Sequence, residues 1–178
     1  MERKTMTEVR NQPGGAKPAQ LAALAGKYLT FRLANEEYGL EIIKVQEIIG
    51  LMPVTHVPRV PDYVRGVINL RGRIIPTINL RAKFGLEPVP DTDKTCIIVV
   101  EVASPKGGKV SMGIIVDEVA EVLDVAAEEV DQAPEFGATL SIDFILGVGI
   151  VKGGVKILLD IDKVLTWEEV KAMANMGT

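Results

Sequence analysis

The sequence is poor in the residues that most often carry covalent or metal chemistry. Its 178 residues include one cysteine, Cys96, and one histidine, His56. A single cysteine cannot form an intramolecular disulfide, and no cysteine–histidine cluster has the spacing of a zinc site. Neither a phosphate-binding G-x-x-x-x-G-K-[ST] loop nor a G-x-G-x-x-G fingerprint is present. The sequence therefore predicts a protein that is not an enzyme and that holds no metal and no cofactor.

Long apolar runs and an excess of positive charge are also missing. No apolar stretch approaches the roughly 20 residues that span a bilayer, and the N-terminus lacks the apolar core of a signal peptide. We therefore expect a cytoplasmic protein that does not insert into membranes. Lysine and arginine total 20 against 24 aspartates and glutamates, which gives a net charge of −4. Nucleic-acid binders usually carry a basic face, so this balance argues against nucleic acid as a partner.

Aromatic residues make up only 4% of the chain, so the core must be aliphatic. Valine, isoleucine and leucine dominate the apolar set, and the β-branched ones among them favour strands. Short apolar segments alternate with turn signals such as Arg-Gly-Arg at 71–73 and Lys-Gly-Gly at 152–154. This pattern is typical of small barrels or a sandwich. We expect a hairpin at each of these turns, a brief helix over 79–84 and a closing helix over 160–173.

Composition also suggests the boundaries. Residues 1–26 have no sustained apolar period and predict a flexible N-terminal tail. The proline-rich, acidic stretch 86–95 is the best internal boundary. We therefore expect a first barrel over about 35–90 and a second over about 91–160 that also takes the N-terminal strand. Residues 160–178 then form the C-terminal helix and the end of the chain.

The chain resembles itself in two blocks. Residues 39–49 align without gaps on residues 113–123, and residues 66–72 align on residues 147–153. Because both blocks recur in the same order, the sequence predicts two like-folded halves that arose by internal duplication. Two small barrels in one chain leave an apolar groove and exposed strand edges, which suit protein docking.

One ion pair can be predicted from the residues alone. Arg71 lies at the first hairpin turn, and its guanidinium is a planar fork suited to carboxylates. Glu47, at the end of an apolar segment, is its partner if the two elements are adjacent. The alternative interpretation is a solvated surface pair without a function. Cys96 opens an apolar strand and is expected to pack rather than react.

Four segments resemble the CheW family of bacterial chemotaxis coupling proteins. The run 63–81, YVRGVINLRGRIIPTINLR, is similar to the signature of that family. Segments 36–40, 44–48 and 133–136 are also similar to it. The resemblance covers about residues 27–165, which is nearly the whole chain after the tail.

The resemblance implies a mainly β fold of two five-stranded, SH3-like barrels with short helices. It also implies a non-enzymatic adaptor that joins the histidine kinase CheA to the cytoplasmic tips of methyl-accepting chemoreceptors. The kinase would be contacted through its regulatory domain, and the cytoplasmic adaptor would be recruited to membrane-associated receptor arrays.

The resemblance further implies two kinds of binding surface. Six residues match family positions at or near the groove that takes the receptor helix: Val45, Glu47, Arg71, Cys96, Gly113 and Val122. Val54 and Ile74 match a kinase-facing surface of the first barrel. Phe136 matches a second kinase-facing surface on the other barrel.

Two other functions stay open as alternatives. Small barrels often bind single-stranded nucleic acid, although the negative charge and the scarcity of aromatics oppose this function. An enzyme with a carboxylate or arginine site is the other alternative, but no recognisable catalytic pair of carboxylates is present.

Overall fold

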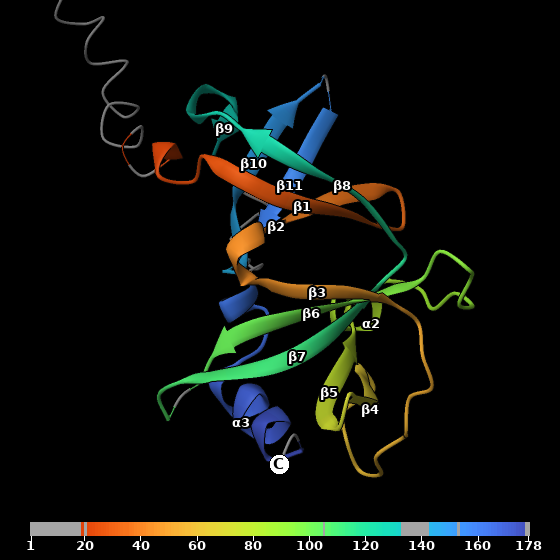
Figure 1. The fold of residues 1–178 in the computed structure, drawn as a ribbon. Helices are drawn as coiled ribbons and strands as arrows, with labels where there is room; N and C mark the ends of the chain where they lie inside the picture. The colour runs from red at the N-terminus through yellow and green to blue at the C-terminus, as the bar shows by residue number, and fades with distance from the viewer. Residues whose placement is uncertain (1–18, 20, 105, 133–142, 153, 177–178) are drawn as a thin grey trace, which may run out of the picture.

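The fold is built from two β-sheets that lie one above the other in Figure 1. The computed structural model describes residues 19, 21–104, 106–132, 143–152 and 154–176. The elements in chain order are β1 (Gly26–Leu33), β2 (Glu36–Glu41), the 3-10 turn η1 (Ile42–Lys44), β3 (Val45–Gly50), β4 (Val64–Leu70), β5 (Arg73–Asn79), α2 (Leu80–Lys83), β6 (Cys96–Ala103), β7 (Lys109–Val116), β8 (Glu118–Val125), η2 (Ala127–Glu129), β9 (Val130–Asp131), β10 (Ile145–Val151), β11 (Gly154–Leu159), η3 (Ile161–Lys163) and α3 (Trp167–Met176).

Both sheets have the same internal order. Sheet A, the upper one in Figure 1, has six strands in the order β8-β1-β2-β11-β10-β9. Sheet B, the lower one, has five strands in the order β3-β6-β7-β5-β4. Each sheet is antiparallel except for one parallel pair, β11 with β2 in sheet A and β5 with β7 in sheet B. The expected mainly β fold with two small sheets, short helices and a C-terminal helix is therefore confirmed, although the sheets are not closed barrels and sheet A has six strands rather than the expected five.

The predicted duplication is visible in the strand register. Thr77 pairs with Gly113 in the parallel pair of sheet B, and Leu158 pairs with Gly39 in the parallel pair of sheet A. These two pairs are equivalent in the sequence alignment of the halves. The bulges recur as well, one between Val64 and Gly66 in sheet B and one between Ile145 and Gly147 in sheet A. The two sheets therefore share both their strand pairing and the positions of these bulges.

The expected boundary between the barrels is wrong. Strands β6 and β7 were expected in the second barrel, over 91–160, but they pair with β3 and β5 of sheet B. Strand β2 was expected in the first barrel, over 35–90, but it pairs with β1 and β11 of sheet A. Consecutive strands change sheet twice, at η1 between β2 and β3 and at Asp117 between β7 and β8. Strand pairing follows long-range register, whereas the proline-rich stretch 86–95 is only a surface connection within sheet B.

The described residues form three buried apolar clusters. The largest, which we call the shared core, takes side chains from both sheets and from α3. Each sheet also has a smaller core of its own. Strand β6 shows how the sequence builds both, because Ile98 and Val100 enter the shared core while Ile97 and Val99 enter the core of sheet B. A strand that is buried on both faces requires such a continuous apolar run.

The N-terminal tail is shorter than the expected 1–26. Leu21 and Leu24 pack against the core of sheet A. The Tyr28 hydroxyl donates a hydrogen bond of 2.7 Å to the carbonyl of Leu24, and burial raises the pKa of Tyr28 to about 12. Two leucines three residues apart were too short a signal to predict this docking. Residues 1–18 and 20 lie outside the described residues.

Side-chain caps set the limits of the two helices. Asn79 accepts hydrogen bonds from the backbone amides of Arg81 and Ala82, which starts the predicted short helix, α2. The closing helix was expected from Asp160, but Asp160 instead caps the separate turn η3. Helix α3 begins after Thr166, whose hydroxyl accepts from the Glu169 amide at 3.2 Å while the Thr166 amide donates to the Glu169 carboxylate at 2.7 Å. This reciprocal cap fixes the later start.

The variant Gly66→Ala tests whether the bulge in β4 requires glycine. Gly66 has φ +144°, and a Cβ there would overlap the carbonyl oxygen of Thr55, which accepts a 2.9 Å hydrogen bond from the Val67 amide. Gly66→Ala should lower the free energy of unfolding by about 1–3 kcal/mol or more, from backbone strain and the lost bridge. Urea unfolding measures this free energy. Gly50→Ala is the control, because a Cβ added at Gly50 would have nothing within 4 Å. Equal stability of the two variants would contradict the requirement for glycine at position 66.

Glu169 fastens α3 to sheet B. It accepts from the Tyr63 hydroxyl at 2.5 Å and from Lys83 at 2.9 Å. Burial opposes ionisation, but these bonds outweigh it and hold the pKa of Glu169 below its ordinary value. A lowered folded pKa gives stability that is present at neutral pH and lost as the pH falls through it.

Glu169→Gln should therefore destabilise the protein by about 1–3 kcal/mol at neutral pH, because charged hydrogen bonds are lost. Urea unfolding should be repeated at successively lower pH, down to values below the ordinary pKa of glutamate. The difference in free energy of unfolding between this variant and the unmodified chain should shrink as the pH falls. Glu168→Gln, an exposed neighbour, is the matched control. If the difference in free energy of unfolding stays constant with pH, the ionised carboxylate of Glu169 is not what holds α3 against sheet B.

Candidate protein-binding surfaces

The predicted ion pair between Glu47 and Arg71 is present. Arg71 lies at the turn between β4 and β5 with φ +53°, and Gly72 follows it with φ +86°. The amide of Gly72 donates to the Asn69 side chain at 2.8 Å, which holds this turn. Arg71 then reaches back to the edge strand β3, where it donates to the Glu47 carboxylate. That hydrogen bond raises the pKa of Arg71 above its ordinary value.

Gly113 lies in the same cross-strand row as Glu47. Val99 pairs with Glu47 on one side and with Gly113 on the other, so the three residues form one row across β3, β6 and β7. A Cβ on Gly113 would lie 2.9 Å from Ile97 Cγ2 and 3.0 Å from Thr77 Oγ1. Gly113 is buried and therefore shapes this end of sheet B rather than offering contact surface. We call Glu47, Arg71 and Gly113 the mouth of sheet B.

Val45, Cys96 and Val122 belong to a different face. A bulge separates Val45 from Glu47, so Val45 lies opposite Val100 of the shared core while Glu47 lies opposite Val99. Val45 and Cys96 pack at the margin of the shared core. Residues that pair directly across strands share a face of the sheet. We call Val45, Cys96 and Val122 the intersheet seam.

Val122 shows that the seam draws on both sheets. It lies in the edge strand β8 opposite Leu29 of the shared core, and 51% of it is exposed. Its duplicate in sheet B is Ile48, which lies opposite Ile98 and is 43% exposed. Ile48 was not among the predicted site residues, although the alignment of 39–49 on 113–123 pairs it with Val122.

The ion pair of the mouth recurs in sheet A. Lys152 lies at the β10–β11 turn with φ +55°, and its Nζ is 3.4 Å from the Glu121 carboxylate. The aligned blocks place Glu121 on Glu47 and Lys152 on Arg71. Both copies of the duplication therefore have an ion pair between an edge strand and a hairpin turn, and lysine replaces arginine in sheet A.

Val54 and Ile74 lie on either side of β4. Val54 packs against the core of sheet B and precedes Thr55, which forms a bridge to Val67 of β4. Ile74 in β5 pairs with Asn69 of β4 and is 40% exposed. Phe136, the third predicted kinase-facing residue, lies outside the described residues.

Cys96 is a free thiol that donates to the Lys94 carbonyl at 3.2 Å. Within the described part of the chain, no three His, Cys, Asp or Glu side chains come together as a metal site. Over the same residues, no helix combines the length and the apolar character needed to cross a bilayer.

Comparison of the sequence with known proteins identifies the family of this chain. The family model described as CheW-like domain matches residues 27–169. The chain belongs to the CheW-like domain family. It is 41% identical over 164 residues to "Chemotaxis protein CheW" of Klebsiella aerogenes, a match that covers 89% of this chain and 96% of that protein. It is 33% identical over 144 residues to "Chemotaxis protein CheW" of Rhizobium meliloti, which covers 81% and 90%.

A solved member of the CheW-like family has a similar fold. The crystal structure of scaffolding protein TtCheW from Thermoanaerobacter tengcongensis aligns with a TM-score of 0.71 at 31% identity. The alignment covers 82% of this chain and 97% of that structure. The chain is thus a member of a family of chemotaxis scaffolds rather than of enzymes.

The ion pair at the mouth of sheet B lies at the surface, with the side chain of Arg71 68% exposed and that of Glu47 29% exposed, and surface pairs contribute little to stability. Glu47→Gln and Arg71→Gln should therefore leave the thermal unfolding midpoint close to that of the unmodified chain. Differential scanning calorimetry measures this. A large drop for either variant would show that the pair holds the fold together, and Lys27→Gln, from the exposed pair with Asp124, sets the scale for a neutral change.

Proposed function

We propose that this CheW-like chain is an adaptor that couples methyl-accepting chemoreceptors to the histidine kinase CheA. It would bind the cytoplasmic receptor tip at the seam and mouth, and the regulatory domain of the kinase around Val54 and Ile74. The observation that carries the proposal is the separation of the two residue sets. Val45, Glu47 and Val122 lie in the edge strands β3 and β8, whereas Val54 and Ile74 lie on either side of β4. This spacing would let two partners be held at once, with Arg71 at the β4–β5 turn between the two sets.

The seam suits a helical partner. A receptor tip is a helical hairpin, and such a helix docks apolar side chains at i, i+3 or i+4 and i+7 into a groove. Val45 and Cys96 offer partly buried aliphatic and thiol surface, and Val122 is half exposed. Glu47 and Arg71 would orient the helix at the rim through their charges. Each contact is small, so the array would gain strength from many linked contacts, which raise effective concentration.

Nothing in the described residues favours the alternative of a single-stranded nucleic-acid binder. Proteins of that kind present aromatic rings on which bases stack. Here Phe31, Tyr38, Phe84 and Phe144 form a continuous row, with successive ring centroids 5.7, 5.7 and 4.9 Å apart. The row packs in or against the shared core, so these rings stack on one another.

Val45→Asp tests the receptor surface. The added charge at the margin of the shared core should weaken binding to a receptor-tip fragment about tenfold or more, and leave binding to the kinase regulatory domain unchanged. Isothermal titration with each fragment measures both affinities. Val89→Asp, which places the same charge at an exposed valine of the 86–95 connection, is the control.

Ile74→Ser provides the reciprocal variant, because it should weaken kinase binding and spare the receptor fragment. Circular dichroism should show that both variants are folded. If the folded, unmodified chain binds neither fragment, the proposed function is wrong. If Val45→Asp reduces both affinities equally, the assignment of two separate surfaces is wrong.

A further inference from the structure

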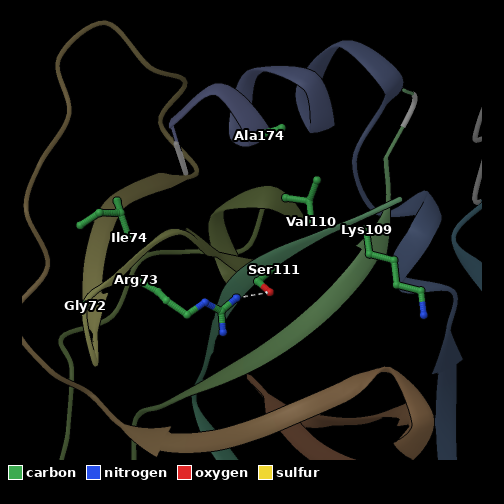
Figure 2. Close-up of a pocket in the computed structure, with 7 residues that line it drawn as sticks. All are labelled: Gly72, Arg73, Ile74, Lys109, Val110, Ser111 and Ala174. Carbon is green, nitrogen blue, oxygen red and sulfur yellow. Dashed lines mark hydrogen bonds between the residues drawn. The ribbon is translucent and has the colours of Figure 1, made fainter. Parts of the chain in front are cut away.

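A hollow of about 450 Å³ opens beside Ile74, where the end of the β4–β5 hairpin meets β7 and α3 (Figure 2). Arg73 and Ile74 line it from β5, Lys109, Val110 and Ser111 line it from β7, and Ala174 lines it from α3. None of the residues predicted for the receptor surface lies in it. Ile74, however, belongs to the surface proposed for the kinase, so the hollow continues that surface.

The guanidinium of Arg73 is directed across the hollow. Its Nη2 donates to the Ser111 hydroxyl at 2.8 Å, as the dashed line in Figure 2 shows. Ser111 in turn donates to Gln46 at 2.9 Å, and Gln46 donates to Glu101 at 2.9 Å. This chain of hydrogen bonds fixes the direction of Arg73 without giving it a carboxylate. A guanidinium has five N–H donors, so Arg73 keeps donors for a further acceptor.

The absence of a carboxylate partner distinguishes Arg73 from most arginines of the fold. Four arginines form ion pairs with carboxylates within the described residues: Arg32, Arg65, Arg71 and Arg81. Arg73 forms none among these residues. The other cation of the hollow, Lys109, lies 3.8 Å from Glu101, and Figure 2 shows its ammonium turned away from Arg73. Arg73 is therefore the cation that a ligand in the hollow would meet.

The remaining walls restrict the ligand. Ile74, Val110 and Ala174 supply apolar surface next to the guanidinium. Ala174 lies in the last turn of α3, and the C-terminal end of a helix carries partial negative charge. A dianionic phosphate is disfavoured there relative to a carboxylate with one charge. Arg and carboxylate also match in planar, bidentate geometry.

We propose that the hollow accepts an aspartate or glutamate side chain of the protein that covers Ile74. Arg73 would be the residue that recognises this charge, and the apolar wall would contact the neighbouring side chain of the partner. This inference rests on the proposed function, because it takes that partner to be the regulatory domain of the kinase. It adds an electrostatic requirement to a surface otherwise built from aliphatic side chains.

Arg73→Gln is the test variant. Its affinity for the kinase regulatory domain should fall about tenfold, because the partner's carboxylate is left unpaired at the interface. The salt dependence of binding should also become flatter than that of the unmodified chain, because one charge–charge contact is gone. Arg73→Lys should keep the salt dependence while losing part of the affinity, since lysine lacks the fork. Lys171→Gln, an exposed cation of α3, is the control and should change neither quantity.

Titrations over a range of salt concentrations, with a receptor-tip fragment as a second ligand, separate the outcomes. Unchanged kinase affinity and salt dependence in Arg73→Gln, together with a loss of affinity in Ile74→Ser, would overturn the carboxylate assignment alone. Competition by inorganic phosphate at low millimolar concentration would also overturn it. Self-association of the unmodified chain that Arg73→Gln abolishes would identify a second copy as the occupant and reject the kinase. If the unmodified chain fails to bind the kinase domain, the proposed function fails first.

Discussion

The shared core between the two sheets is the interaction on which the rest of the structure depends. Strands β2 and β7 each continue into a strand of the opposite sheet, so each sheet contains strands from both duplicated halves. Neither half can complete a sheet alone. Leu40 and Ile114, which are equivalent in the duplication, are both fully buried in this one core. Burial of aliphatic surface there fixes how the sheets sit relative to each other.

This constraint explains where the proposed binding surfaces lie. The edge strands β3 and β8 each turn one face to the shared core and leave Ile48 and Val122 half exposed at its margin. The proposed adaptor would have to hold two partners in a fixed relation, and a common core provides that rigidity. Arg71 and Lys152 each connect a hairpin turn to an edge strand through a surface ion pair, one at the mouth of sheet B and the other at the equivalent place in sheet A.

Local sequence signals predicted individual turns, caps and strands, whereas contacts between distant segments decided which strands share a sheet. The hairpins, the Asn79 cap and the duplication were readable because each depends on residues close in sequence or on a direct repeat. The pairing of Arg71 with Glu47 was readable from charge and turn position. The exchange of strands between sheets was missed, because a proline-rich connection at 86–95 looks like a domain boundary. The hollow at Arg73 was missed because Ser111 and Ala174 reach it from distant segments.

Hydrogen exchange in a shared-core variant tests the central claim most directly. Leu40→Ala removes a fully buried side chain that sheet A contributes, and such a change costs about 2–5 kcal/mol. If the core is truly shared, amide protection in β6 and β7 of sheet B should fall by the same factor as in β1 and β2 of sheet A, because both sheets open together. Protection lost in sheet A and retained in sheet B would contradict the account and show two independently folded units.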